Sequence, residues 1–232
     1  MNFFGRLFGT FLDPDRTMKA VTARPAWVEA LVILLILLAI YSYLLFPLGQ
    51  EETLKSMEDG ATRLKEKWGE DRYAAAVERV GNQSRALTSL LFAPLISLVG
   101  FLFSSLLVLG IGRLSSTQGN YLQVFSSFLH ANFIDKVLGN GLRYFLATSR
   151  GSVMQTTTGL PVFFPRMDVA STSYAVLSQV DFFQLWMFGV FGLGLASAFK
   201  FSVKRALIIS YCFWALKSVL MAALAIARAK MM

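Results

Sequence analysis

The stretch that decides the fold is residues 182–227, which reads FFQLWMFGVFGLGLASAF (182–199), KFSVKR (200–205) and ALIISYCFWALKSVLMAALAIA (206–227). Two long apolar runs are separated by a short turn that carries Lys200, Lys204 and Arg205. Runs of about 20 apolar residues suit helices that cross the ~30 Å hydrocarbon core of a bilayer. We therefore expect two membrane-spanning helices joined by a cationic hinge.

The composition of the whole chain agrees with a membrane setting. Apolar residues make up 55% of the 232 residues, and the mean hydropathy is +0.56. The net charge of +8 does not indicate nucleic acid, because Lys and Arg are spread between apolar runs and form no basic stripe. The single cysteine, Cys212, excludes a disulfide within the chain and a cysteine-based metal site, and we expect it to be a packed core thiol.

Three further apolar segments precede this pair, at residues 27–46, 87–111 and 121–146. The third is the weakest candidate for a span, because lipid tolerates polar side chains poorly. It contains His130, Asn132, Asp135, Lys136, Asn140 and Arg143. The sequence thus predicts an all-α polytopic membrane protein, a single domain over 1–232 with a bundle of about five transmembrane helices. Uniform apolar runs do not match the alternating pattern of barrel strands.

Charges beside the spans predict the orientation. Cations gather before the first span and in the hinge, and such clusters mark the cytoplasmic side. They are Arg6, Arg16, Lys19 and Arg24 before the first span, and Lys200, Lys204 and Arg205 in the hinge. Five spans then place the C-terminus outside, which Arg228 and Lys230 weakly oppose. If 121–146 does not cross, the C-terminus lies inside and those two cations fit.

Three segments lie outside the predicted spans. Residues 1–26 form a cytoplasmic amphipathic lead, with Phe3, Phe4, Leu7, Phe8, Phe11 and Leu12 on one helical face. Residues 47–86 contain an extracytoplasmic amphipathic helix whose apolar stripe is Leu54, Met57, Ala61, Leu64 and Trp68. We expect this stripe to fold back on the bundle, with docking of a partner helix as the alternative. Residues 148–180, with Pro161 and Pro165, predict an extracytoplasmic loop that caps the bundle or covers a cavity.

Several motifs near the C-terminus resemble the C-terminal half of the Yip1 domain family. They are Asp181-Phe182-Phe183-Gln184-Leu185-Trp186, Gly192-Leu193-Gly194-Leu195, and Ser202-Val203-Lys204-Arg205-Ala206 before a run containing Trp214. The front of the chain is also similar, with Pro14, then Pro25 close to Trp27, and a long apolar span, whereas the middle is similar in layout alone.

This resemblance implies a five-span protein with a cytoplasmic N-terminus that has no enzymatic activity. It implies a scaffold or accessory subunit that associates with other membrane proteins. In a eukaryote the family resemblance implies a role in vesicle trafficking. In a bacterium it implies a role beside an envelope transporter or in membrane homeostasis. The short tails favour a bacterial inner (cytoplasmic) membrane protein. The expected partners are membrane lipids and other integral membrane proteins or further copies of the chain.

Small residues on 182–199 predict close helix packing, because they let helix backbones approach one another. They are Gly189, Gly192, Gly194, Ala196 and Ala198. Asp181 precedes this helix, where its carboxylate is expected to cap free N–H groups; ligand or ion binding is the alternative role.

Ionisable residues at membrane depth are the remaining candidates for activity: His130, Asp135, Lys136 and Lys217. Neighbouring helical residues point about 100° apart, so Asp135 and Lys136 are not an obvious pair. We expect Lys217 to meet Asp135 or a backbone carbonyl across the bundle, as a structural contact. The alternative is a proton or substrate path, which defines a second functional class, a small transporter or channel.

No catalytic, metal or cofactor motif is apparent in the sequence. The chain lacks a His-Glu-x-x-His motif and a Gly-x-Ser-x-Gly motif, and one histidine cannot build a metal site. Gly192-Leu193-Gly194 lies inside an apolar run and lacks the strand and turn of a phosphate-binding loop. We therefore predict a protein that is not an enzyme and has no cofactor.

Overall fold

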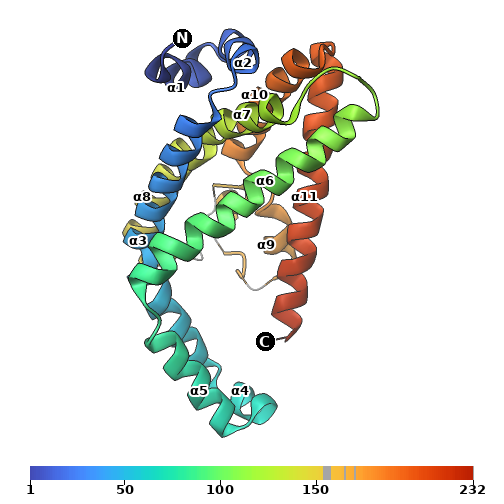
Figure 1. The fold of residues 1–232 in the computed structure, drawn as a ribbon. Coiled ribbons are helices and arrows are strands. Elements are labelled where there is room, and N and C mark those ends of the chain that lie inside the picture. The colour runs from blue at the N-terminus through green and yellow to red at the C-terminus, as the bar shows by residue number, and fades with distance from the viewer. Residues whose placement is uncertain (154–157, 165, 170, 232) are drawn as a thin grey trace.

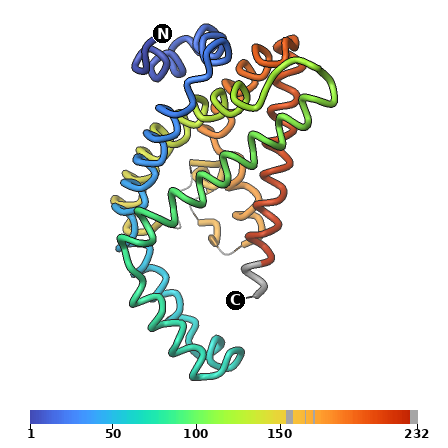
Figure 2. Tube along the Cα trace, in the orientation of Figure 1, coloured from blue at the N-terminus to red at the C-terminus, as the bar shows by residue number. Residues whose placement is uncertain are grey.

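A computed structural model describes residues 1–153, 158–164, 166–169 and 171–231, with side chains as far as residue 227. Long helical segments run alternately between the two ends of the molecule (Figure 1). They are α3 (Trp27–Asp59), η1–α6 (Leu87–Phe92 and Ala93–Arg113), α7–η2–α8 (Tyr121–Phe133, Ile134–Gly139 and Asn140–Arg150), α10 (Phe182–Phe199) and α11 (Val203–Met231). The N-terminus lies at one end, and α11 runs from that end towards the other (Figure 2).

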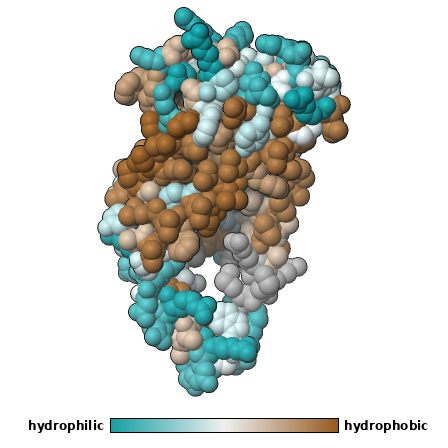
Figure 3. Space-filling view, viewed as in Figure 1, coloured by the Kyte–Doolittle hydropathy of each residue, from teal (hydrophilic) through white to brown (hydrophobic). Residues whose placement is uncertain are grey.

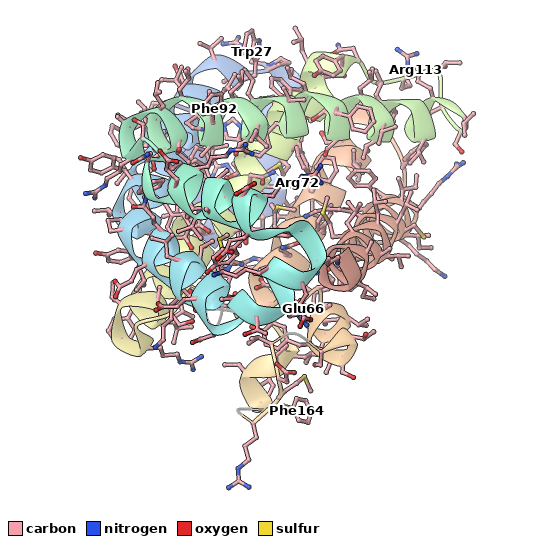
Figure 4. The ribbon with its side chains drawn as sticks, turned by 90° about the horizontal axis from the view of Figure 1, so that it is seen from below. Trp27, Glu66, Arg72, Phe92, Arg113 and Phe164 are labelled. Atoms are coloured by element: carbon pink, nitrogen blue, oxygen red, sulfur yellow. The ribbon has the colours of Figure 1, made fainter. Side chains whose placement is uncertain are left out.

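Four of these segments are long and apolar enough to cross a membrane: Trp27–Asp59, Leu87–Arg113, Phe182–Phe199 and Val203–Ala227. In the space-filling view an apolar belt separates two hydrophilic ends (Figure 3). Seen from below, Phe92, which directly precedes α6, and Arg113, its last residue, lie at opposite ends of α6, and Phe164 lies at the opposite edge of the molecule (Figure 4). The chain is thus an all-α polytopic integral membrane protein.

The segment α7–η2–α8 is the polar helix of the bundle, and other helices enclose its first half. Every residue from Val124 to Phe133 is buried, where α7 packs against α10, α6, α3 and α2. Aromatic rings form much of this core; Phe128 and Phe191, for example, lie 5.0 Å apart between ring centroids. The polar side chains of α7 therefore face protein instead of lipid. The helix thus avoids much of the free-energy cost of polar groups in lipid, the cost that made 121–146 the weakest predicted span.

The N-terminal helices α1 (Phe3–Leu12) and α2 (Pro14–Ala23) lie across one end of the bundle (Figure 1). The Asp13 side chain accepts a hydrogen bond from Arg16 N and separates the two helices. The apolar residues of α1 divide between two faces. Phe3, Leu7 and Phe11 pack against the core, whereas Phe4, Phe8 and Leu12 are exposed. The exposed set has the geometry of an interfacial helix.

At the other end, the chain extends beyond the bundle. Helix α3 continues through Pro47 to Asp59, past the predicted span end at Phe46, and is followed by α4 (Ala61–Trp68) and α5 (Glu70–Gly81). Leu64 of the predicted apolar stripe is buried where α4 packs on α5, and Tyr73 Oη donates to Met57 O. The stripe thus supports a projecting helical hairpin and does not fold back on the bundle, so that expectation is wrong.

The described part of 158–180 contains η3 (Leu160–Phe163) and α9 (Thr172–Leu177), and α9 packs against α11. Leu160 N donates to Val180 O, beside an isolated bridge between Gly159 and Asp181. Pro165, on which part of the loop prediction rests, lies outside the described residues. Cys212 is exposed, because its side chain lies on the outer surface of α11, so the expectation of a packed core thiol is wrong.

Candidate functional site: a buried charge cluster

Four charged side chains meet inside the bundle, and we call Asp135, Lys136, Arg143 and Asp181 the charge cluster. Arg143 Nη2 donates to Asp135 Oδ1 at 2.8 Å and to Asp181 Oδ2 at 2.9 Å. The exposed fractions of the two aspartate side chains are 4% and 5%. One guanidinium therefore joins η2, α8 and the start of α10.

Neutral donors and acceptors complete the coordination of the cluster. Arg143 Nη1 donates to Asn140 Oδ1 at 3.0 Å, and Arg143 Nε donates to Thr158 Oγ1 at 3.2 Å. Thr158 Oγ1 in turn donates to Asp181 Oδ2. Three guanidinium nitrogens are thus hydrogen-bonded, which is the condition under which a buried ion pair is tolerated.

Gly139 makes the contact between Asp135 and Arg143 possible. Helical side chains lean towards the N-terminus, so Arg143 extends back over residue 139 towards Asp135. A Cβ atom at Gly139 would lie 3.0 Å from Arg143 Nη1 and 3.1 Å from Asp135 Oδ1. It would also lie 3.2 Å from Phe183 Cβ of α10. The absence of a side chain at 139 therefore leaves the path along which the guanidinium reaches the carboxylate.

Asp181 serves the cluster and its own helix at once. Its Oδ1 accepts from Gln184 N at 3.1 Å, which is the geometry of an N-cap, and its Oδ2 accepts from Arg143. The carboxylate also lies at the positive end of the α10 dipole. The two oxygens thus hold the start of α10 against α8.

Lys136 and Asp135 form an ion pair, although adjacent positions on a regular helix point apart. Lys136 Nζ lies 2.7 Å from Asp135 Oδ2. Both residues belong to η2, a π-helical segment that is wider than an α-helix, and the lysine stem is long enough to turn back. The expectation that these neighbours would not pair is therefore wrong.

Lys217 lies near the cluster but bonds elsewhere. Its Nζ donates to Gln184 Oε1 at 3.0 Å and lies 5.7 Å from the centroid of the Phe188 ring. Both partners come from α10, because the larger α10–α11 interface brings them closer than η2. An ion pair between Lys217 and Asp135 is not formed.

His130 is separate from the cluster. It is fully buried on α7, and its Nδ1 lies 2.8 Å from Ser126 O. Its Nε2 has no hydrogen-bond partner among the residues that the structure describes. His130 therefore has no contact through which it could act with Asp135.

The small residues of α10 face several different neighbours. A Cβ atom at Gly189 would lie 2.9 Å from Tyr211 Oη, and one at Gly192 would lie 2.7 Å from Leu207 Cδ2, both on α11. A Cβ atom at Gly194 would lie 2.6 Å from Ser127 Cβ of α7. Ala198 is buried and Ala196 is partly buried in the same core. Close approach of α10 to α7 and α11 thus depends on these positions.

The family model of the Yip1 domain matches residues 8–225. The chain belongs to the Yip1 domain family. No curated protein and no solved structure matches the chain significantly. The matched range includes the whole charge cluster, so the cluster lies within the Yip1 domain of this chain.

The arrangement holds η2, α8 and the start of α10 together through paired charges. Each charge of the cluster is paired, and no group of three metal-binding side chains occurs among the described residues. Sequence reasoning noted Arg143 as a polar residue of a weak span but missed it as the centre of the cluster. The available signal was the spacing of Asp135, Gly139 and Arg143, which are successively four residues apart and share a helical face.

Proposed function

We propose that this Yip1 protein is a non-enzymatic scaffold or accessory subunit that acts through helix–helix association with other integral membrane proteins. The observation that supports this role is the closed charge cluster. Arg143 neutralises two buried aspartates, and Lys136 adds a second cation to Asp135. Charged groups that are already paired with one another hold the helices in position. They have little capacity left to bind and release an ion that passes through the bundle.

The competing proposal is a small transporter or channel with Asp135, Lys136 and Lys217 along its path. Two clefts, one between α2 and the end of α10 and one beside Pro47, are lined by other residues. Lys217→Met separates the two functions. A scaffold should lose stability or assembly because Gln184 Oε1 loses its donor, whereas a transporter should keep its fold and lose flux.

The surface for association is proposed to include the outer face of α6. Gly100 and Gly110 are exposed there, and a Cβ atom at either position meets nothing within 4 Å. Small exposed residues on a membrane helix allow another helix to approach closely. Lipid is the alternative neighbour of this face.

Gly100→Leu tests this surface in the intact protein. The variant should fold as wild type, because its side chain has open space within the chain, but should lose a co-purifying membrane partner. Leu98→Ala, on the same helix where the side chain is partly buried, is a matched control that should retain the partner. If Gly100→Leu retains every partner, the outer face of α6 is not part of the interface.

We further propose that the N-terminal end faces the cytoplasm, in a bacterial inner membrane. The cations Arg16, Lys19 and Arg24 lie on or beside α2, at the same end as the turn between α10 and α11 (Figure 1). Such clusters mark the cytoplasmic side. Labelling of single cysteines placed at Lys204 and at Asp71 with an impermeant maleimide on intact cells tests this. Only the cysteine at 71 should react.

A further inference from the structure

A cleft of about 520 Å³ opens at the N-terminal end of the bundle, between α2, the first turn of α7, the end of α10 and the start of α11. Its wall combines two kinds of surface. Leu193, Phe201 and Val203 are apolar, whereas Lys19 and Lys200 carry charge. The polar side chains between them bond within the wall: Thr22 Oγ1 to Ser197 Oγ at 2.6 Å, and Gln123 Nε2 to Thr22 O at 3.0 Å.

Lys200 has a backbone conformation that other residues adopt more easily. Its φ is 57° and its ψ is 35°, the left-handed region, where it ends α10. Glycine or asparagine is usual at this position, because a Cβ atom is strained there. The side chain of this exposed lysine nevertheless forms part of the cleft wall.

The charge of the wall favours an anion. Asp15 also lines the cleft, but its carboxylate is 2.5 Å from Lys19 Nζ, so the three ionised side chains leave one net positive charge. The first turns of α7 and α11 border the cleft and add the positive ends of two helix dipoles. The negative end of the α10 dipole opposes these positive ends. It is partly offset, because Ser116 Oγ donates to Phe199 O there and the Lys200 cation follows directly.

The position of the cleft matches the headgroup layer. The helices that line it meet at the N-terminal end of the bundle (Figure 1), and that end is one of the two hydrophilic ends beside the apolar belt (Figure 3). The exposed cations Lys204 and Arg205 follow Val203 of the cleft wall directly in the chain. We propose that the cleft binds the phosphate of an anionic phospholipid. Lys19 and Lys200 contact the phosphate oxygens, and Leu193 and Phe201 contact the glycerol and the first carbons of the acyl chains. Lysine is a suitable ligand for phosphate, and basic clusters at this depth attract anionic lipids. This site does not depend on the proposed scaffold role.

Native mass spectrometry of the purified full chain in mild detergent tests the proposal. The probes are dioctanoyl phosphatidylglycerol, dioctanoyl phosphatidylcholine and inorganic phosphate. Wild type should bind phosphatidylglycerol in preference to phosphatidylcholine. Lys200→Gly should weaken phosphatidylglycerol binding about five-fold, the effect of one lysine at a membrane surface. Glycine also suits the left-handed backbone at 200, so this variant is expected to fold.

Two further variants make the test specific. Lys204→Ala removes a neighbouring exposed cation that does not line the cleft, and it should leave phosphatidylglycerol binding unchanged. Asp15→Asn removes the carboxylate that competes for Lys19, and it should tighten binding about two-fold or more.

Three results would overturn the proposal. Equal losses in Lys204→Ala and Lys200→Gly would show a diffuse charge effect, and equal binding of the two lipids would show no anionic preference. Binding of inorganic phosphate as tight as that of phosphatidylglycerol would assign the cleft to a soluble phosphate instead of a lipid. Circular dichroism and size-exclusion chromatography of each variant separate lost binding from lost folding.

Discussion

Replacement of Arg143 by Met tests whether the charge cluster holds the bundle together. Methionine keeps an apolar stem but removes the group that bridges Asp135 and Asp181, whose side chains are 4% and 5% exposed. Asp135 keeps Lys136, whereas Asp181 keeps the neutral donors Thr158 Oγ1 and Gln184 N. Removing one partner of a buried ion pair costs about 3–5 kcal/mol, because the other charge stays buried without compensation. We expect the free energy of unfolding to fall by that amount.

Equilibrium unfolding in mixed micelles with increasing dodecyl sulfate, followed by tryptophan fluorescence, measures this change. Lys19→Met is the control, because its ion pair with Asp15 joins side chains that are 65% and 56% exposed and should contribute less than about 0.5 kcal/mol. Adding Asp181→Asn to Arg143→Met should recover part of the loss, since the unpaired charge is then removed. A loss for Arg143→Met as small as that for Lys19→Met would refute the structural role of the cluster.

Four other substitutions have defined expectations in the same unfolding assay. Gly192→Leu should destabilise the protein by about 1–3 kcal/mol, because the new side chain would overlap α11. Gly110→Ala has open space at its Cβ and should be neutral or stabilising. Equal effects of the two substitutions would contradict the packing described for α10. Lys200→Gly should leave the free energy of unfolding unchanged or raise it by up to about 1 kcal/mol, because it removes a Cβ atom from a residue in the left-handed region. A clear decrease in the free energy of unfolding would mean that the lysine side chain supports the hinge. Gln184→Leu should cost about 1–3 kcal/mol because Lys217 Nζ loses its acceptor, and an unchanged midpoint would show that Lys217 finds another.

The architecture followed from patterns that are local in the chain. The apolar runs from Trp27, Leu87, Phe182 and Ala206 lie in the four helices that are apolar and long enough to cross a membrane. The membrane makes this step direct, because a backbone in lipid must satisfy its own hydrogen bonds. The end of α3 was not predictable in the same way, since Pro47 and the charges after it ended the apolar run but not the helix.

The site was harder to predict because it depends on contacts between distant segments. The sequence identifies three members of the cluster as ionisable or capping residues, namely Asp135, Lys136 and Asp181. It indicates Arg143 only as a polar residue that makes 121–146 a weak span. Its role needs the glycine at 139 and the widened helix η2, and neither has a hydropathy signal. The partner of Lys217 was misjudged because α10 and α11 pack along their length, which brings Gln184 closer than Asp135.

The most direct test of the proposed role is affinity purification of the tagged full chain from its native membrane in mild detergent, with mass spectrometry of the proteins that co-elute. A scaffold or accessory subunit should bring down another integral membrane protein in stoichiometric amount, and Gly100→Leu should reduce its recovery while the chain stays folded. Recovery of the chain alone as a monodisperse homo-oligomer, with Lys217→Met folded and inactive in a flux assay, would contradict the scaffold and support a transporter.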